Sequence, residues 1–131
     1  MHLLAILLAG AANVVLGMLW YNPRLFGSAW MRMINMTPEQ AELGTKRMPL
    51  MAAIGFVAAV FMAWVLSVVQ TAFGVYDVYG ALDVGFWIWA GFVAPILLGV
   101  VLWEAKPVAL YLINVLFWLI SILSMSVILA W

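Results

Sequence analysis

Four long apolar stretches constrain the fold of this chain more than any other feature. They lie at Leu3–Tyr21, Pro49–Phe73, Ala81–Trp103 and Pro107–Ala130. Because about 20 helical residues cross a hydrocarbon core of about 30 Å, each stretch is long enough to span a bilayer. A content of 69% hydrophobic and 8% charged residues excludes an ordinary soluble globular domain. The sequence therefore predicts an all-α membrane protein with four transmembrane helices, folded as a single domain over residues 1–131.

The first stretch also has to be weighed as a signal peptide. Ala9-Gly10-Ala11-Ala12 resembles a small-residue cleavage site, but no Lys or Arg precedes it and the apolar run continues to Trp20. We therefore expect a spanning helix that is not cleaved.

The basic residues indicate how the four helices are oriented. They fall in two connections, with Arg24, Arg32, Lys46 and Arg47 between the first two stretches and Lys106 between the last two. The connection on the other side contains no Lys or Arg. The positive-inside rule then predicts that both termini lie outside the cytoplasm.

Residues 22–48 are predicted to form an interfacial and cytoplasmic helical segment. The first helix should stop at Asn22, which precedes a proline, and a second helix should start there, with Asn22 as N-cap and Pro23 as its first residue. At helical spacing, an apolar arc faces a polar arc, which is typical of an amphipathic helix lying in the interface. The apolar arc holds Phe26, Trp30, Met33 and Ile34, and the polar arc holds Arg24, Ser28, Arg32 and Asn35.

Six residues are expected to anchor this segment at the membrane interface, namely Trp20, Tyr21, Phe26, Trp30, Arg24 and Arg32. Aromatic rings favour the headgroup boundary, and basic side chains favour anionic headgroups. A lipid-sensing role is the alternative to simple anchoring. Further on, Thr37-Pro38-Glu39-Gln40 predicts a capping box and a short cytoplasmic helix that ends near Gly44. Pro49 would then lie in the first turn of the second span.

Few polar side chains lie inside the predicted spans. Counting 1.5 Å per residue from the cytoplasmic ends of their helices places Asn13 and Asn114 at nearly one depth. Pro95 cannot donate a hydrogen bond to the carbonyl of Gly91. We expect Asn13, Asn114 and the Gly91 carbonyl to form an intramembrane polar cluster, more typical of contact between helices than of a substrate site.

Small residues recur at helical spacing in three of the spans. They are Asn13 and Gly17, then Gly55, Ala59, Ala63 and Ser67, and finally Ala81, Gly85, Gly91, Pro95 and Gly99. Such stripes allow close approach of helices, either within one bundle or between chains. Trp64 and Trp118 also lie inside spans, where they would fill grooves or contact a pigment or lipid.

The sequence offers little for catalysis or for metal binding. There is no cysteine, and His2 is the only imidazole. Ser121, Ser124 and Ser126 have no base beside them and are expected to pair with the backbone. No stretch is basic enough to bind nucleic acid. We therefore expect no enzymatic activity, no cofactor, no metal and no nucleic-acid partner.

A block at the end of the first stretch resembles a known family. The likeness rests on Gly17, Leu19-Trp20-Tyr21, Asn22-Pro23, Phe26-Gly27 and Trp30, and less specifically on Gly91-Phe92 and Ile113-Asn114. These residues are similar to the signature of the bacterial membrane proteins of domain-of-unknown-function family 1761. The resemblance implies a four-helix protein of the bacterial cytoplasmic (inner) membrane, without an established activity.

Two functions remain open from the sequence. The first is a non-catalytic protein that acts by association, as a homo-oligomer or as an accessory subunit of a larger membrane complex. Its partners would be the lipid bilayer and other membrane protein chains. The alternative is an oligomeric channel or carrier for a small neutral or lipidic solute.

Overall fold

The structure is a computed structural model that describes residues 2–131, and no strand occurs in this part of the chain. Its elements are α1 (Leu3–Trp20), α2 (Gly27–Met33), α3 (Pro38–Ala72), α4 (Val78–Ile88), the π-helix η1 (Trp89–Val93), α5 (Ala94–Leu97), α6 (Gly99–Leu102) and α7 (Val108–Ala130). Four helical segments are long and apolar enough to cross a membrane, at Leu3–Trp20, Pro38–Ala72, Val78–Leu102 and Val108–Ala130. The prediction of an all-α protein with four candidate transmembrane helices is confirmed.

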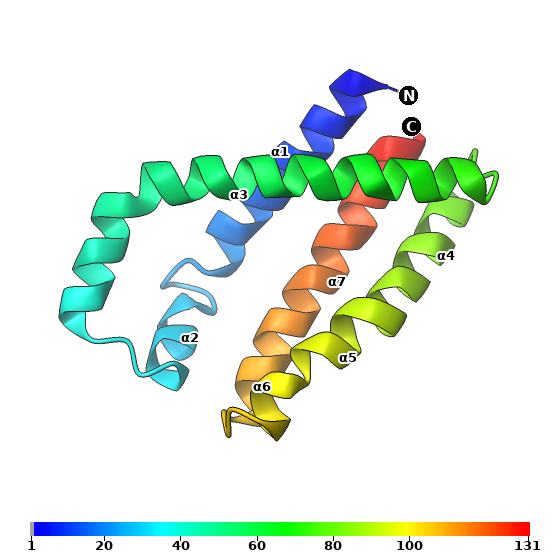
Figure 1. Cartoon of the computed structure of the whole chain (residues 1–131). Coiled ribbons are helices and arrows are strands. Elements are labelled where there is room, and N and C mark those ends of the chain that lie inside the picture. The colour runs from blue at the N-terminus through cyan, green and yellow to red at the C-terminus, as the bar shows by residue number, and fades with distance from the viewer. Residues whose placement is uncertain (1) are drawn as a thin grey trace.

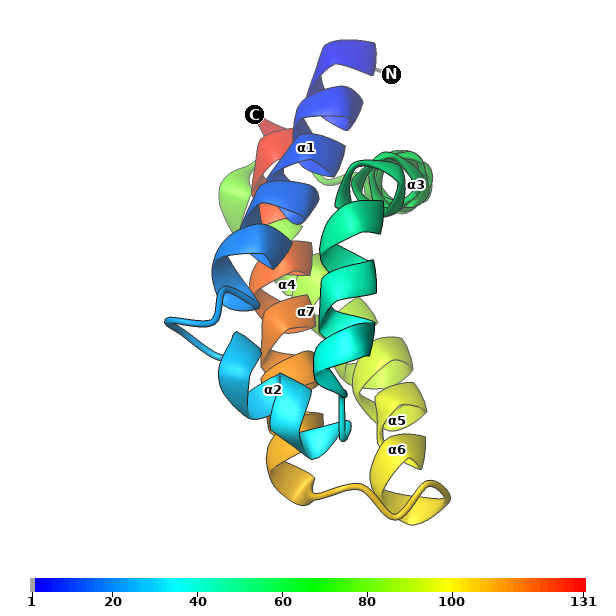
Figure 2. The same ribbon diagram turned by 90° about the vertical axis from the view of Figure 1, so that its left-hand side faces the viewer.

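Helix α7 lies at the centre of the molecule. It packs against α1 on one side and α4 on the other, and the three helices lie side by side in Figures 1 and 2. The second half of α3 crosses them obliquely and contacts all three (Figure 1). Eight residues of α7 are buried, against four of α3. The core of the protein is therefore built around α7.

Small residues bring α1 and α3 close together. Ala9 on α1 and Ala59 and Ala63 on α3 are completely buried. Gly10 faces α3 so closely that an added Cβ would lie 2.6 Å from Cγ2 of Val60. Because small residues add little bulk at the contact, the two backbones can approach closely and make more van der Waals contacts. Such contacts favour helix association in lipid. Part of the small-residue pattern read from the sequence thus packs within the chain.

Helix α3 begins as predicted but does not end as predicted. The capping box is confirmed, because the Thr37 side chain accepts from the Gln40 N–H and the Gln40 side chain accepts from the Thr37 N–H. The predicted end near Gly44 and the predicted new start at Pro49 are wrong, since one helix runs through both residues to Ala72. Proline in a helix removes one hydrogen bond and usually bends the helix. Figure 1 accordingly shows α3 bent before it crosses the other helices.

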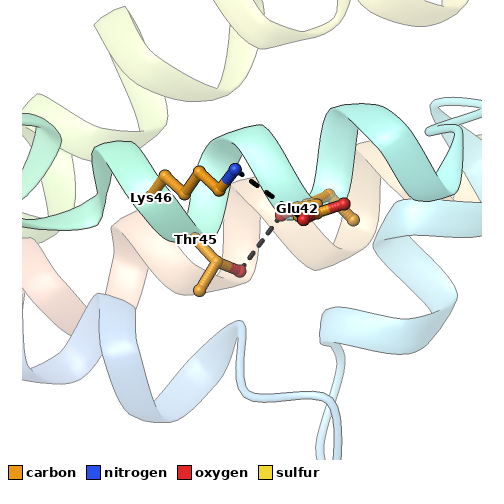
Figure 3. A network of polar contacts seen from close by, with 4 residues as sticks. Glu42, Thr45 and Lys46 are labelled. Atoms are coloured by element: carbon orange, nitrogen blue, oxygen red, sulfur yellow. Dashed lines mark hydrogen bonds and ion pairs between the residues drawn. The ribbon is translucent and has the colours of Figure 1, made fainter.

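The first part of α3 is polar and exposed (Figure 3). Nζ of Lys46 lies 3.8 Å from Oε1 of Glu42, and both side chains are more than 70% exposed, at 73% and 72%. Thr45 donates its hydroxyl to the carbonyl of Ala41 at 3.1 Å. Exposed pairs with this spacing contribute about 0.3–0.5 kcal/mol. They support the helix locally without joining it to the rest of the protein.

The turn after α1 also differs from the prediction. Asn22 is not an N-cap and Pro23 is not the first residue of a helix, because α2 begins at Gly27. The Asn22 side chain accepts from the Arg24 N–H at 2.9 Å, and its carbonyl accepts from the N–H groups of Leu25 and Gly27 at 2.8 and 3.0 Å. Asparagine that bonds to its own neighbouring backbone favours a turn over a helix start.

The third candidate span is not one regular helix. It starts at Val78, ahead of the predicted Ala81, because Asp77 caps the helix by accepting from the Gly80 N–H at 2.8 Å. The π-helical turn η1 comes just before Pro95, and α5 and α6 meet at Leu98. Proline has no N–H to donate to the carbonyl one turn before it, so one helical hydrogen bond is missing at Pro95. A π-helical turn accommodates such a local break in the α-helical hydrogen bonding.

Two hydrogen bonds fasten this irregular segment to α7. The indole N–H of Trp89 donates to the carbonyl of Val115 at 2.8 Å, and the hydroxyl of Tyr111 donates to the carbonyl of Ala94 at 2.9 Å. Partly buried side chains thus hold in place a segment whose own helical bonding is interrupted.

Candidate functional site

A series of polar contacts joins α1 to α7, and we call it the α1–α7 ladder. The Ser121 hydroxyl donates to Oδ1 of Asn13, and the Tyr21 hydroxyl donates to Oδ1 of Asn114 at 2.6 Å. The indole N–H of Trp20 donates to the carbonyl of Ile113 at 3.0 Å. Asn13 bonds to residue 121, whereas Trp20 and Tyr21 at the end of α1 bond to residues 113 and 114, so the two helices are antiparallel.

The predicted polar cluster is not formed in the expected way. Asn13 and Asn114 both lie in the ladder but have different partners, and Ser121 is two turns from Asn114, about 10 Å along the helix. Gly91 and Pro95 are exposed, and a Cβ on Gly91 would meet nothing within 4 Å. The depth estimate failed because it treated the C-terminal end of α1 and the N-terminal end of α7 as level, whereas the end of α1 lies beside Asn114.

The Asn13–Ser121 contact is expected to stabilise the fold measurably. Asn13→Leu and Ser121→Ala should each lower the free energy of unfolding by about 0.5 to 2 kcal/mol, because hydrogen bonds between spanning helices contribute on this scale. Thermal unfolding in mild detergent measures the effect. Ser124→Ala is the matched control, since Ser124 lies on the same helix and is only partly buried. Additive losses in the double variant would show that the two side chains do not stabilise each other.

The six predicted interface anchors separate into two groups. The four aromatic ones contact each other, with ring centroids 4.5 Å apart for Trp20 and Phe26 and 5.5 Å apart for Tyr21 and Trp30. Phe117 of α7 lies beneath them, 6.4 Å from Trp20 and 5.4 Å from Tyr21. The rings therefore hold α2 against α1 and α7, in addition to any contact with lipid.

The basic anchors, Arg24 and Arg32, have exposed side chains. Exposure leaves both guanidinium groups free to meet headgroups, as an amphipathic surface helix requires. The interfacial position of α2 remains a prediction.

Gln70 is a buried polar residue that the sequence analysis missed. Its side chain is 5% exposed, and its amide N–H donates to the carbonyl of Ser126 at 3.0 Å. The Ser126 hydroxyl donates to the carbonyl of Ile122 at 2.7 Å, as expected for a serine in a spanning helix. The same expectation is wrong for Ser121, whose hydroxyl bonds to the Asn13 side chain. The sequence pattern could have indicated this burial, because Gln70 lies on the same helical face as Ala63 and Leu66.

A groove, which we call the α3–α4 groove, opens between α3, α4, η1 and α7. Its volume is about 410 Å³, and its walls are five residues of α3 from Phe61 to Val69, together with Ile88, Phe92, Ile122 and Met125. All the lining side chains are apolar. Such a groove suits a hydrocarbon chain better than an ion or a polar solute.

The two intramembrane tryptophans do not share a site. Trp64 is 45% exposed and lies 5.9 Å from the ring of Phe61. Trp118 is partly buried, with its ring 5.1 Å from that of Phe117. Within residues 2–131, no group of three His, Cys, Asp or Glu residues is placed to hold a metal ion.

Within residues 2–131, these observations define a multi-pass membrane protein of four candidate spanning helices, joined by partly buried polar contacts and flanked by an apolar groove. A family model described as "Protein of unknown function (DUF1761)" matches residues 4–130. The chain belongs to this family, which confirms the resemblance seen at the end of the first stretch. Comparison with curated proteins and with solved structures finds no match.

Proposed function

We propose that this protein acts by association inside the bacterial cytoplasmic membrane, as a homo-oligomer or as an accessory subunit of a larger complex, and that it is not an enzyme. Both termini would lie outside the cytoplasm, as the basic residues of the sequence indicate. The observation that carries the proposal is a stretch of α3, residues 49–58, in which no side chain is buried.

This free surface is the first half of the apolar part of α3. Between residues 49 and 58 every side chain is exposed or partly exposed, whereas Ala59 and Ala63 beyond it are buried. Gly55 belongs to the same small-residue stripe, and a Cβ there would meet nothing within 4 Å. One end of the stripe thus packs inside the chain, while the other end is open to a neighbouring helix.

Site-directed crosslinking tests the association directly, because the chain has no cysteine of its own. With Gly55→Cys labelled by a photoactivatable maleimide, which on illumination bonds to any neighbouring chain, native membranes are expected to give a covalent product containing this chain. A product of twice the chain mass indicates a homo-oligomer, and a product of another mass indicates an accessory subunit.

Val15→Cys is the control for that experiment. Val15 is 54% exposed on α1, outside the free surface of α3. Random collisions in the membrane would crosslink both positions to the same extent. Equal crosslinking at the two positions, or none at Gly55→Cys, would contradict association through α3.

The alternative function, a carrier for a lipidic solute, draws support from one observation. The α3–α4 groove is apolar and has the volume of a small-molecule site. The polar side chains of the α1–α7 ladder bond to each other, which favours a role in holding the helices together over lining a path for polar solutes. The groove therefore supports the lipidic form of this alternative more than the channel form.

A further inference from the structure

A second hollow lies near the α3–α4 groove, at the connection between α3 and α4. That hollow has a volume of about 270 Å³ and is lined by residues 73–77 together with Gly80, Asp83 and Val84. Val69 of the groove and Phe73 of the hollow are one helical turn apart, and so are Ile88 and Val84 on α4. The same faces of α3 and α4 thus line both spaces, and we call the two neighbouring spaces together the trough.

The chemistry of the trough changes along its length. The deep part is apolar, whereas the hollow holds two carboxylates, Asp77 and Asp83. Tyr76, which lines the hollow, and Tyr79 are 89% and 83% exposed, as rings at a headgroup boundary are. The sequence contains no Lys or Arg between Arg47 and Lys106. The open end of the trough is therefore anionic, and its deep end is hydrocarbon-like.

The trough is at least as deep as one leaflet. At 1.5 Å per residue, Ile88 and Phe92 lie about 15 and 21 Å along the helix from Val78. Half of a hydrocarbon core of about 30 Å is about 15 Å, which is the reach of an acyl chain from its headgroup. A helix of a second chain is about 10 Å wide and would need a groove that runs through the full depth of the core. The trough therefore suits a single acyl chain better than a helix.

We propose that this trough binds a phospholipid whose headgroup carries an amine, with one acyl chain in the α3–α4 groove and the ammonium group beside Asp77 and Asp83. The two carboxylates at the open end attract the positively charged amine of such a headgroup. The same carboxylates repel a headgroup whose only charge is its phosphate. The site goes beyond association through α3 and does not depend on it.

Native mass spectrometry of the purified full-length protein tests the headgroup preference. The protein is mixed with phosphatidylethanolamine and phosphatidylglycerol of identical acyl chains, and the retained lipid is weighed. Phosphatidylethanolamine is expected to dominate. Asp83→Asn and Asp77→Asn should each lower its excess about fivefold, the effect of one charge near a membrane surface. Asn caps a helix as well as Asp does, so the second variant keeps the start of α4.

Glu104→Gln is the control for charge, because Glu104 is an exposed carboxylate in the connection between α6 and α7. It should leave the lipid ratio unchanged. Equal retention of the two lipids by the unaltered protein would overturn the headgroup assignment. So would an equal loss of preference in Glu104→Gln and in the two Asp variants.

A second experiment tests whether the lipid binds in the α3–α4 groove, by attaching a bulky label there after the protein has folded. Val65→Cys and Leu82→Cys are labelled with a bulky maleimide on the purified protein, which has no other thiol. Val65 lines the groove and Leu82 does not, although they are similarly exposed, at 40% and 37%. Label at Val65→Cys should abolish retention of both lipids, and label at Leu82→Cys should not. Unchanged retention with both labels, or covalent dimers of Val65→Cys through a short bifunctional maleimide, would overturn the proposal.

Discussion

Gly27→Ala is expected to destabilise the protein by about 3 kcal/mol, the upper part of the usual range for overpacking. A Cβ at this position would lie 2.1 Å from the carbonyl oxygen of Tyr21 and 2.8 Å from the carbonyl carbons of Tyr21 and Asn22. These are backbone atoms of the turn that leads into α2, so no side chain can rotate away to make room. The turn would have to open, and the ring contacts between α2 and α1 would be lost with it.

Thermal unfolding in mild detergent measures this effect, with the fraction that stays monodisperse after heating as the readout. Gly44→Ala is the control, because a Cβ there would meet nothing within 4 Å. Alanine is a better helix former than glycine by about 1 kcal/mol, so the control should be as stable as the parent or more stable. Equal stability of the two variants would mean that the turn before α2 does not have the described geometry.

Gly10→Ala is expected to cost about 2 kcal/mol, whereas Gly17→Ala on the same helix should cost nothing. At Gly10 the new Cβ would lie 2.6 Å from Cγ2 of Val60 and 3.1 Å from its backbone nitrogen. At Gly17 the nearest atom is 3.6 Å away on the ring of Phe117, which is ordinary contact. The difference arises because α3 approaches α1 at one glycine and not at the other.

The same unfolding measurement separates these two variants. Gly10→Ala combined with Val60→Ala should recover part of the loss, since the nearest clashing atom is removed while the backbone contact remains. Equal stability of Gly10→Ala and Gly17→Ala would contradict the close crossing of α1 and α3.

The sequence predicted those parts of the fold that depend on local pattern. The apolar stretches located the four candidate spanning helices because length and hydropathy alone decide whether a helix can cross a bilayer. The capping box at Thr37 was found because its hydrogen bonds join residues three apart. Both features need no knowledge of where distant segments lie.

The continuity of α3 could not be read in the same way. Gly44 and Pro49 are both helix-weakening residues, and each favours an interruption on its own. In the structure the helix passes through both and bends instead. A cost of about 1 to 3 kcal/mol at such residues is within the range that neighbouring turns and tertiary packing offset.

The hydrogen-bond partners within the candidate site could not be predicted from the sequence, for a different reason. Asn13 and Asn114 were recognised as the polar residues that matter, but their partners depend on how far α1 slides along α7. That offset is set by the rings of Tyr21 and Phe117 and by the turn at Gly27, which no single helix reveals. Gln70 was not identified because a single polar side chain near the end of a spanning helix is usually exposed to water.

The offset between α1 and α7 has a consequence for the surrounding lipid. Tyr21 lies level with Asn114, and Asn114 is about 9 Å along the helix from Val108, where α7 begins. In a bilayer matched to the length of α7, the polar turn at Asn22 and Arg24 would sit inside the hydrocarbon boundary. Lipids adjust to such hydrophobic mismatch by local thinning. The membrane is therefore expected to dip beside α2, so that the protein deforms the leaflet on the side where its arginines lie.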